Sequence, residues 1–289
     1  MTRAATTRTK EQEPMTANVS RPEGGTGTAA VEMAFALEGV GFAVDGRTLL
    51  QPLTLDLPCG AVIGLVGHNG SGKSTLVKIL ARQQAATSGS VRFRGRPLGE
   101  WRDRAFAREI AYLPQQTPLA PGMRVRELVA LGRYPWHGAL GRFGANDHAK
   151  VAEALALTDT AGFADRHVET LSGGERQRVW LAMLIAQDAG CLLLDEPISA
   201  LDIAHQVEVL GLIRRLSQTR GVTVVVVLHE INMAARFCDD IVALRHGGLV
   251  ARGAPAAIMT PAVLEQIYGI AMGVVASPED GETLAYVRR

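Results

Sequence analysis

Residues 67–75 read Gly67-His68-Asn69-Gly70-Ser71-Gly72-Lys73-Ser74-Thr75 and fit the pattern G-x-x-x-x-G-K-[ST]. They follow the apolar run Ala61–Val66, which is typical of a buried parallel strand, and they open a helical pattern that reaches about Arg82. Such glycines let backbone N–H groups turn toward phosphate oxygens, and the helix N-terminus adds partial positive charge. Lys73 can reach the β- and γ-phosphates, and the Ser74 hydroxyl can ligate Mg²⁺. The stretch therefore predicts a nucleotide-phosphate site where a strand meets a helix.

A second strand of the chain ends in two acids. Cys191–Leu194 is fully apolar and is followed by Asp195 and Glu196. This order predicts that Asp195 lies at the carboxyl edge of the sheet, where it can hold Mg²⁺, usually through water. Glu196, one residue further, can orient and polarise an attacking water. An apolar run before two acids is a weak signal alone, and the phosphate loop makes it a strong one.

The remaining pattern indicates the fold class. Val222–Leu228 is another fully apolar run, and a helical period from Ala204 to about Gln218 precedes it. Alternating buried strands and helices predict an α/β domain with a parallel sheet. Nearer the N-terminus, Phe35–Val44 and Thr48–Leu57 read as strands joined by a turn at Asp45-Gly46, which predicts an antiparallel β region.

Residues 118 to about 170 differ from their surroundings. Val125–Arg133 and Ala149–Ala156 have helical patterns, and the stretch holds no convincing buried strand. We therefore expect a helical subdomain inserted into one α/β domain that spans residues 33–270. Residues 1–32 lack an apolar period and predict a disordered extension, and residues 271–289 predict a C-terminal tail.

Composition excludes several classes of protein. With 47% hydrophobic and 20% charged residues the chain is ordinary for a globular protein, and its net charge of +1 gives no reason to expect a nucleic-acid partner. Cys59, Cys191 and Cys238 are odd in number and lack metal-ligand spacing, which favours a reducing compartment. The apolar run Val222–Leu228 is far shorter than the ~20 residues that span a bilayer. We therefore expect any membrane role to depend on a partner.

A third motif, Leu171-Ser172-Gly173-Gly174-Glu175, precedes a helix predicted from Arg176 to about Ala186. Serine followed by two glycines exposes backbone N–H donors at a helix start, which is a second anion-binding feature. One nucleotide does not need two such features from one subunit. Two subunits facing head to tail would use both, the loop of one and the serine turn of the other.

From about Phe35 to about Ile270 the chain resembles the ATP-binding subunits of ABC transporters. The resemblance implies a P-loop, RecA-like ATPase core that uses ATP and Mg²⁺ and works as a head-to-tail dimer. It assigns 67–75 to Walker A, 171–178 to the signature that acts in trans, and 191–196 to Walker B. It also assigns Asp202 to the D-loop, His229 to the γ-phosphate switch, and Gln115 to a Mg²⁺-linked catalytic position; Gln116, beside it, is the alternative.

Three positions depart from the family pattern. The aromatic residue that stacks on adenine is replaced by Val44, with Phe42 two residues earlier on the same strand face, so we expect one of these two near the base. Ile198 stands where threonine is common, and Glu230 follows His229 where aspartate is common. Neither of the latter changes removes a catalytic group.

Within the family, the chain is most similar to the ATPases of iron–siderophore importers, in particular those for ferric hydroxamates such as ferrichrome. The resemblance lies in Gly132–Gly144, Ala204–Val207 and Leu228–Arg236. Exposed aromatics among arginines within Gly132–Gly144 are reasonable for a protein interface, here with a permease. The alternative, equally compatible with the spacing, is a loop whose aromatics pack on their own subdomain.

The resemblance implies a type II importer, with two of these ATPases beneath a permease dimer and a substrate-binding protein outside the membrane. The chain would then be peripheral, at the cytoplasmic face of a bacterial inner membrane. Import of haem, cobalamin or another chelate is the first alternative. A soluble ABC ATPase is the second, although the chain has neither heptads nor a second phosphate loop.

Overall fold

The computed structural model describes residues 32–118, 120–138, 141–279 and 281–288. Within this part, the central element is a six-stranded sheet in the order β10-β9-β3-β8-β7-β6. Neighbours from β9 to β6 are parallel, and β10 is antiparallel to β9. The strands are β3 (Val62–Val66), β6 (Ile110–Leu113), β7 (Cys191–Leu194), β8 (Thr223–Val227), β9 (Asp240–Arg245) and β10 (Gly248–Gly253).

A separate antiparallel sheet is formed near the N-terminal end of the described residues, in the order β2-β1-β4-β5. Its long strands β1 and β2 are joined by the predicted turn at Asp45-Gly46. The predicted α/β class, with a parallel sheet and an N-terminal antiparallel region, is confirmed. The strands are β1 (Met33–Val44), β2 (Arg47–Pro58), β4 (Ser88–Phe93) and β5 (Arg96–Pro97).

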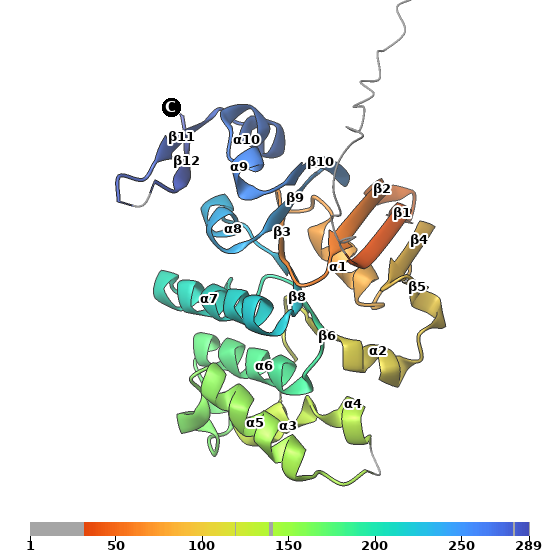
Figure 1. The fold of residues 1–289 in the computed structure, drawn as a ribbon, viewed down its shortest axis with the longest axis vertical. Coiled ribbons are helices and arrows are strands. Elements are labelled where there is room, and N and C mark those ends of the chain that lie inside the picture. Colours follow the sequence, from red (N-terminus) through yellow and green to blue (C-terminus); the bar gives the residue numbers. More distant parts are fainter. Residues whose placement is uncertain (1–31, 119, 139–140, 280, 289) are drawn as a thin grey trace, which may run out of the picture. The chain divides into compact units, whose positions relative to one another are not determined.

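Helices α3 to α6 follow β6 and precede β7 in sequence, and α3, α5 and α6 pack on one another (Figure 1, green). The described residues between Val125 and Gln187 contain no strand element. Two short helices, α2 before β6 and α4 after α3, had no clear periodicity in the sequence. The helices are α1 (Lys73–Leu80), α2 (Asp103–Glu109), α3 (Val125–Leu131), α4 (Tyr134–His137), α5 (Ala145–Leu157), α6 (Gly173–Gln187), α7 (Ile203–Arg220), α8 (Ile231–Phe237), α9 (Pro255–Ile258) and α10 (Pro261–Tyr268).

The core has two parts, one on each face of the central sheet. Alternation along β3 shows the division, because Val62 and Val66 belong to one cluster of buried side chains while Ile63 and Leu65 belong to the other. Between them, a Cβ on Gly64 would lie 2.8 Å from the Sγ atom of Cys238, so this close approach requires glycine. Both faces of β3 are thus covered, which fixes the strand that leads into the phosphate loop.

The two predicted ends of the chain differ in what the structure describes. The predicted extension 1–32 lies outside the described residues except for Glu32. The segment predicted as a tail contains an antiparallel hairpin, β11 (Met272–Ala276) and β12 (Thr283–Val287). Met272 is buried, and Val274 and Ala285 pack against the core, so contacts made outside the hairpin stabilise these short strands. No helix among the described residues is long and apolar enough to cross a membrane.

Candidate nucleotide site

The phosphate loop connects the end of β3 to the start of α1. Gly67 has φ +136° and Gly72, the N-cap of α1, has φ +99°. A Cβ on Gly67 would lie 2.0 Å from the carbonyl oxygen of Leu244, so a larger residue cannot occupy this position without moving backbone. The loop therefore turns as the pattern predicts, and α1 begins at Lys73 with its first N–H groups directed into the loop.

A cavity of about 320 Å³ opens beside this loop. It joins parts of the chain that are far apart in sequence: the loop itself, a glutamine two residues after β6, a glutamate two residues after β7 and a histidine two residues after β8. Its lining residues are Leu49, Asn69, Gly70, Ser71, Gly72, Lys73, Ser74, Thr75, Gln115, Glu196 and His229.

Lys73 is buried at the base of the loop. Its Nζ atom donates hydrogen bonds to the carbonyl oxygens of Gly67, at 2.8 Å, and His68, at 2.9 Å. Burial lowers the pKa of the Lys73 ammonium, and the nearby charges of Glu196 and Asp195 oppose this shift. The ammonium is thus held at the loop by neutral carbonyls, where it can meet a negatively charged ligand.

Asp195 and Ser74 form the second part of the site. The Ser74 hydroxyl donates to Oδ1 of Asp195 at 2.9 Å, while Oδ2 of Asp195 is buried without a hydrogen-bond partner. Burial raises the pKa of the Asp195 carboxyl above its usual value. A hydroxyl and a carboxylate with an unpaired oxygen are the hard oxygen ligands that Mg²⁺ prefers, so the residues present fit this ion.

Glu196 lies at the centre of the polar groups. Its Oε1 is 2.8 Å from Nε2 of His229, and its Oε2 accepts a hydrogen bond from Nε2 of Gln115 at 2.8 Å. Since a carboxylate only accepts, Nε2 of His229 carries the proton in this contact. Gln115 lines the cavity and Gln116 does not, within the described residues, so the geometry favours the first of the two predicted glutamines.

The two residues expected near an adenine base are not part of this cavity. Phe42 and Val44 are both absent from its lining among the described residues, and Leu49, from the next strand, is present. The sequence carried no signal for Leu49, because pairing of β1 with β2 decides which side chain reaches the loop.

His68 belongs to the phosphate loop, but it is not among the described residues that line the cavity. Its Nε2 atom lies 2.6 Å from the carbonyl oxygen of Tyr268, the last residue of α10. The two rings meet edge to face, with centroids 5.7 Å apart. The partner is 200 residues away in the chain, so the sequence motif could not reveal this contact.

The predicted signature and D-loop lie at two helix starts outside the cavity. Ser172 is the N-cap of α6: its hydroxyl accepts from the N–H of Glu175 at 3.2 Å, and Glu175 accepts from the N–H of Ser172 at 2.7 Å. These hydrogen bonds keep the pKa of Glu175 below its usual value. Asp202 caps α7 through the N–H of His205 at 3.0 Å. Within one chain, neither is among the described residues that line the cavity.

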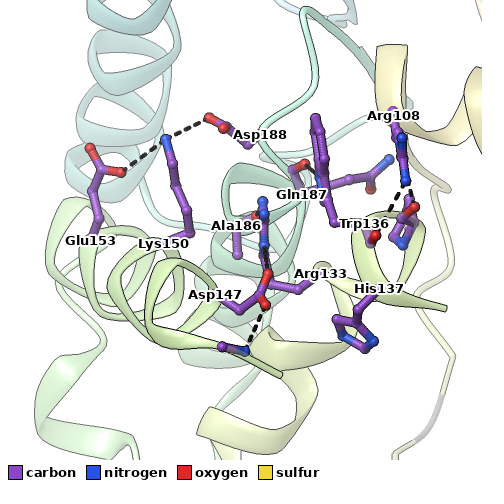
Figure 2. Close-up of polar contacts among 12 residues, drawn as sticks. Arg108, Arg133, Trp136, His137, Asp147, Lys150, Glu153, Ala186, Gln187 and Asp188 are labelled. Carbon is purple, nitrogen blue, oxygen red and sulfur yellow. Dashed lines mark hydrogen bonds and ion pairs between the residues drawn. The ribbon is translucent and has the colours of Figure 1, made fainter. Parts of the chain in front are cut away.

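The aromatic stretch within Gly132–Gly144 combines both alternatives left open by the sequence. Trp136 donates from Nε1 to the Gln187 carbonyl oxygen at 2.7 Å, with Arg108 and Arg133 each 5.1 Å from its ring (Figure 2). Phe143 contacts the rings of His137 and His148. Tyr134, in contrast, is 54% exposed. Trp136, which is 37% exposed, and Phe143 therefore make contacts within their own subdomain, and Tyr134 faces outward.

Comparisons with known proteins agree with the fold. The family described as ABC transporter matches residues 50–199, more than half of the chain. The achromobactin transport ATP-binding protein CbrD of Dickeya dadantii is 43% identical over 232 residues, covering 80% of this chain and 86% of that protein. The iron(3+)-hydroxamate import ATP-binding protein FhuC of Bacillus subtilis is 39% identical over 246 residues, covering 85% and 91%. The hemin import ATP-binding protein HmuV of Streptomyces coelicolor is 41% identical over 270 residues, covering 93% and 95%.

Solved structures agree. A protein described as a metal-chelate type ABC transporter, in an inward-facing conformation, has a TM-score of 0.76 and 26% identity, covering 88% of this chain and 96% of that chain. A dimeric bacterial ABC transporter cassette has a TM-score of 0.68 and 28% identity, covering 76% and 98%. The chain therefore belongs to the ABC transporter family. It is an ATP-binding subunit, an ATPase whose hydrolysis is coupled to transport.

Proposed function

We propose that this chain powers the import of iron–siderophore complexes, ferric hydroxamates first among them, and that the cavity beside Lys73 is its catalytic site. The observation that carries the catalytic part is the position of Glu196, held between Gln115 and His229 at the mouth of the phosphate loop. The cargo is inferred from the relatives, whose names include achromobactin, iron(3+)-hydroxamate, ferric enterobactin and petrobactin transport.

In this proposal each cavity residue has a distinct role. The loop N–H groups and Lys73 bind the phosphates, and His229 gives its Nε2 hydrogen bond to the γ-phosphate when ATP enters. Glu196, released from His229, accepts a proton from the attacking water. Mg²⁺ would be held by Ser74 and Asp195, with Gln115 beside them, and would supply positive charge to the phosphate oxygens.

Two subunits are needed for a complete site. The cavity of one chain lacks the Ser172 turn, whose exposed N–H groups would face the nucleotide of a second, head-to-tail copy. Two such ATPases would lie at the cytoplasmic face of a bacterial inner membrane, beneath a permease dimer that receives cargo from a siderophore-binding protein outside. Exposed Leu131 and Tyr134 are the side chains we assign to the permease contact.

Hemin import is a second candidate for the cargo. The observation that favours it is coverage, since the HmuV relative aligns over 93% of this chain. The nucleotide site is the same for both cargoes, because it contacts only ATP. The choice therefore depends on the permease and its binding protein.

The deciding experiment measures uptake of radiolabelled ferrichrome and of radiolabelled hemin in cells that carry the partner genes. Each cargo is tested with the unmodified chain and with Glu196→Gln, which is close in size but has one amide oxygen in place of two carboxylate oxygens and cannot accept a proton. We expect ferrichrome uptake with the unmodified chain alone, and a turnover about 10²- to 10⁴-fold lower in purified Glu196→Gln. Uptake of hemin but not of ferrichrome would show that the cargo is hemin. Equal ATP turnover by the unmodified chain and Glu196→Gln would refute Glu196 as the base.

A further inference from the structure

The C-terminal part of the chain contacts the phosphate loop through the side chain of His68. In the contact between His68 and the Tyr268 carbonyl, 2.6 Å long, the oxygen only accepts, so Nε2 of His68 carries the proton. The edge-to-face contact of the two rings adds a second attachment at the same place. His68 therefore uses its side chain to fix the loop to α10 and leaves its backbone carbonyl to Lys73.

The end of α10 offers acceptors for such an attachment. Gly269 ends the helix with φ +71°, and the last carbonyl oxygens of a helix have no partner within it. Two of these oxygens are taken by side chains from the central domain. Arg245, at the end of β9, donates to the Gln266 oxygen at 2.8 Å, and His68 binds that of Tyr268.

The hairpin that follows α10 is attached at a second point. Asn232 on α8 donates from Nδ2 to the Ala285 carbonyl oxygen at 3.1 Å and accepts from the Ala285 N–H at 2.7 Å. The side-chain amide thus pairs with β12 as a neighbouring strand would. In Figure 1 the hairpin (dark blue) lies beside α10 and α8. The helix α8 begins at Ile231, two residues after His229.

We propose that His68 and Asn232 are positioning residues, through which the C-terminal strap (α10, β11 and β12) holds the phosphate loop and the His229 turn in a fixed relation. This inference rests on the proposed catalytic site. The loop N–H groups and His229 must meet the same phosphate chain, so loosening either attachment weakens ATP binding. The nucleotide must meet the loop and His229 at the same time, so the effect of each attachment on ATP binding depends on the other being intact.

The test is a double-mutant cycle with His68→Ala, Asn232→Ala and the double variant, in the full chain. Equilibrium ATP affinity is measured in a Glu196→Gln background, so that nucleotide is not consumed, and kcat and KM are measured without that change. Each single variant should lose about 3- to 10-fold in ATP affinity, the range expected for a hydrogen bond. The double variant should lose no more ATP affinity than the more impaired single variant. If the two sites were independent, the fold-losses of the single variants would multiply.

Two further variants keep the test selective. His68→Gln retains an N–H donor and should recover most of the affinity, while His167→Ala removes an exposed histidine outside the cavity and should change nothing. If His68→Ala fails to fold, His68→Phe keeps the ring and removes the donor. The proposal would be overturned if the losses of ATP affinity multiply in the double variant, or if neither single variant loses affinity.

Failure of the strap can be told apart from failure of the proposed function. A cycle that shows coupling while cells import no iron chelate would support the strap and refute only the cargo. Absence of ATP binding by the unmodified chain would overturn the catalytic site and the strap together. ATP binding that is normal in the unmodified chain and unchanged in every variant would overturn the strap alone.

Discussion

Buried polar groups are unpaired at the nucleotide cavity and paired in a cluster of the helical region. This arginine cluster consists of Arg133, Trp136, Asp147 and Gln187. The buried hydroxyl of Ser71, which lines the cavity, has no hydrogen-bond partner. Oδ2 of Asp195 has none either, and Asp195 contacts the cavity residue Ser74 through its other oxygen. In the cluster, the Arg133 side chain is 2% exposed, donates to Asp147 at 2.8 Å and to the Ala186 carbonyl oxygen at 2.9 Å, and lies over Trp136 (Figure 2).

This difference separates a site that awaits a ligand from a structural joint. A buried polar atom without a partner costs about 1–3 kcal/mol, and beside the phosphate loop a bound ligand can supply the missing partner. The cluster instead joins three helices, since Arg133 precedes α4, Asp147 lies in α5, and Gln187 ends α6. Both regions attract attention in the sequence, and only the pairing of their polar atoms tells them apart.

The largest effect should come from Asp195→Asn. The change keeps an acceptor for Ser74 but removes the charge, so we expect ATP turnover to fall more than about 100-fold. Because a buried charge disappears, the free energy of unfolding without nucleotide should stay equal or rise. Turnover assays and urea unfolding at pH 7 measure the two quantities. A loss of stability above about 1 kcal/mol would mean that Asp195 is structural like Asp147.

The reverse pattern is expected for Arg133→Met. Removing one partner of a buried ion pair costs about 3–5 kcal/mol of unfolding free energy, because Asp147 is left without its cation. ATP turnover per folded molecule should change far less. The matched control is Arg126→Met, whose pair with Asp165 spans 2.6 Å between side chains 54% and 67% exposed. That pair should contribute less than about 1 kcal/mol to the free energy of unfolding. Equal losses of stability in Arg133→Met and Arg126→Met would contradict a structural role for the arginine cluster.

A smaller effect concerns pH. The N–H of Gly144 and the Arg133 guanidinium lower the pKa of Asp147 below its ordinary value of 3.8. A depressed folded-state pKa gives stability that is fully present above the unfolded value and is lost as pH falls through the folded one. Compared with the unmodified chain, Asp147→Asn should therefore show a shallower loss of stability below pH 3.8. The free energy of unfolding is measured against pH for both chains. Equal slopes below this pH would contradict the role given to the Asp147 carboxylate.

Much of the nucleotide site follows from local sequence. A Gly-rich turn between an apolar strand and a helix, and an acid at the end of another apolar strand, can each be recognised within ten residues or so. The residues predicted on this basis, Lys73, Ser74 and Glu196, line one cavity. Phe42 and Val44 were chosen in the same way for adenine and are absent from that lining among the described residues, because a stacking partner depends on how β1 and β2 pair.

The helical region and the C-terminal end were harder to predict. The helix α4 has only four residues, from Tyr134 to His137, and is stabilised by bonds from Arg104 and Arg108 of α2 to its carbonyl oxygens. Such a helix has no period of its own to detect. The hairpin after α10 reads as a tail for the same reason, because each of its strands has five residues.

By itself, the sequence determined the α/β class, the order of the motifs and the chemistry of the phosphate loop, since glycines, a lysine and acids at strand ends act through local backbone geometry. The tertiary structure alone decided that Leu49 reaches the cavity, that the His68 side chain contacts α10, and that Trp136 donates to the Gln187 carbonyl oxygen while Tyr134 is more exposed. Each of these depends on a contact between residues distant in the chain, and burial and hydrogen-bond pairing in the folded protein select it.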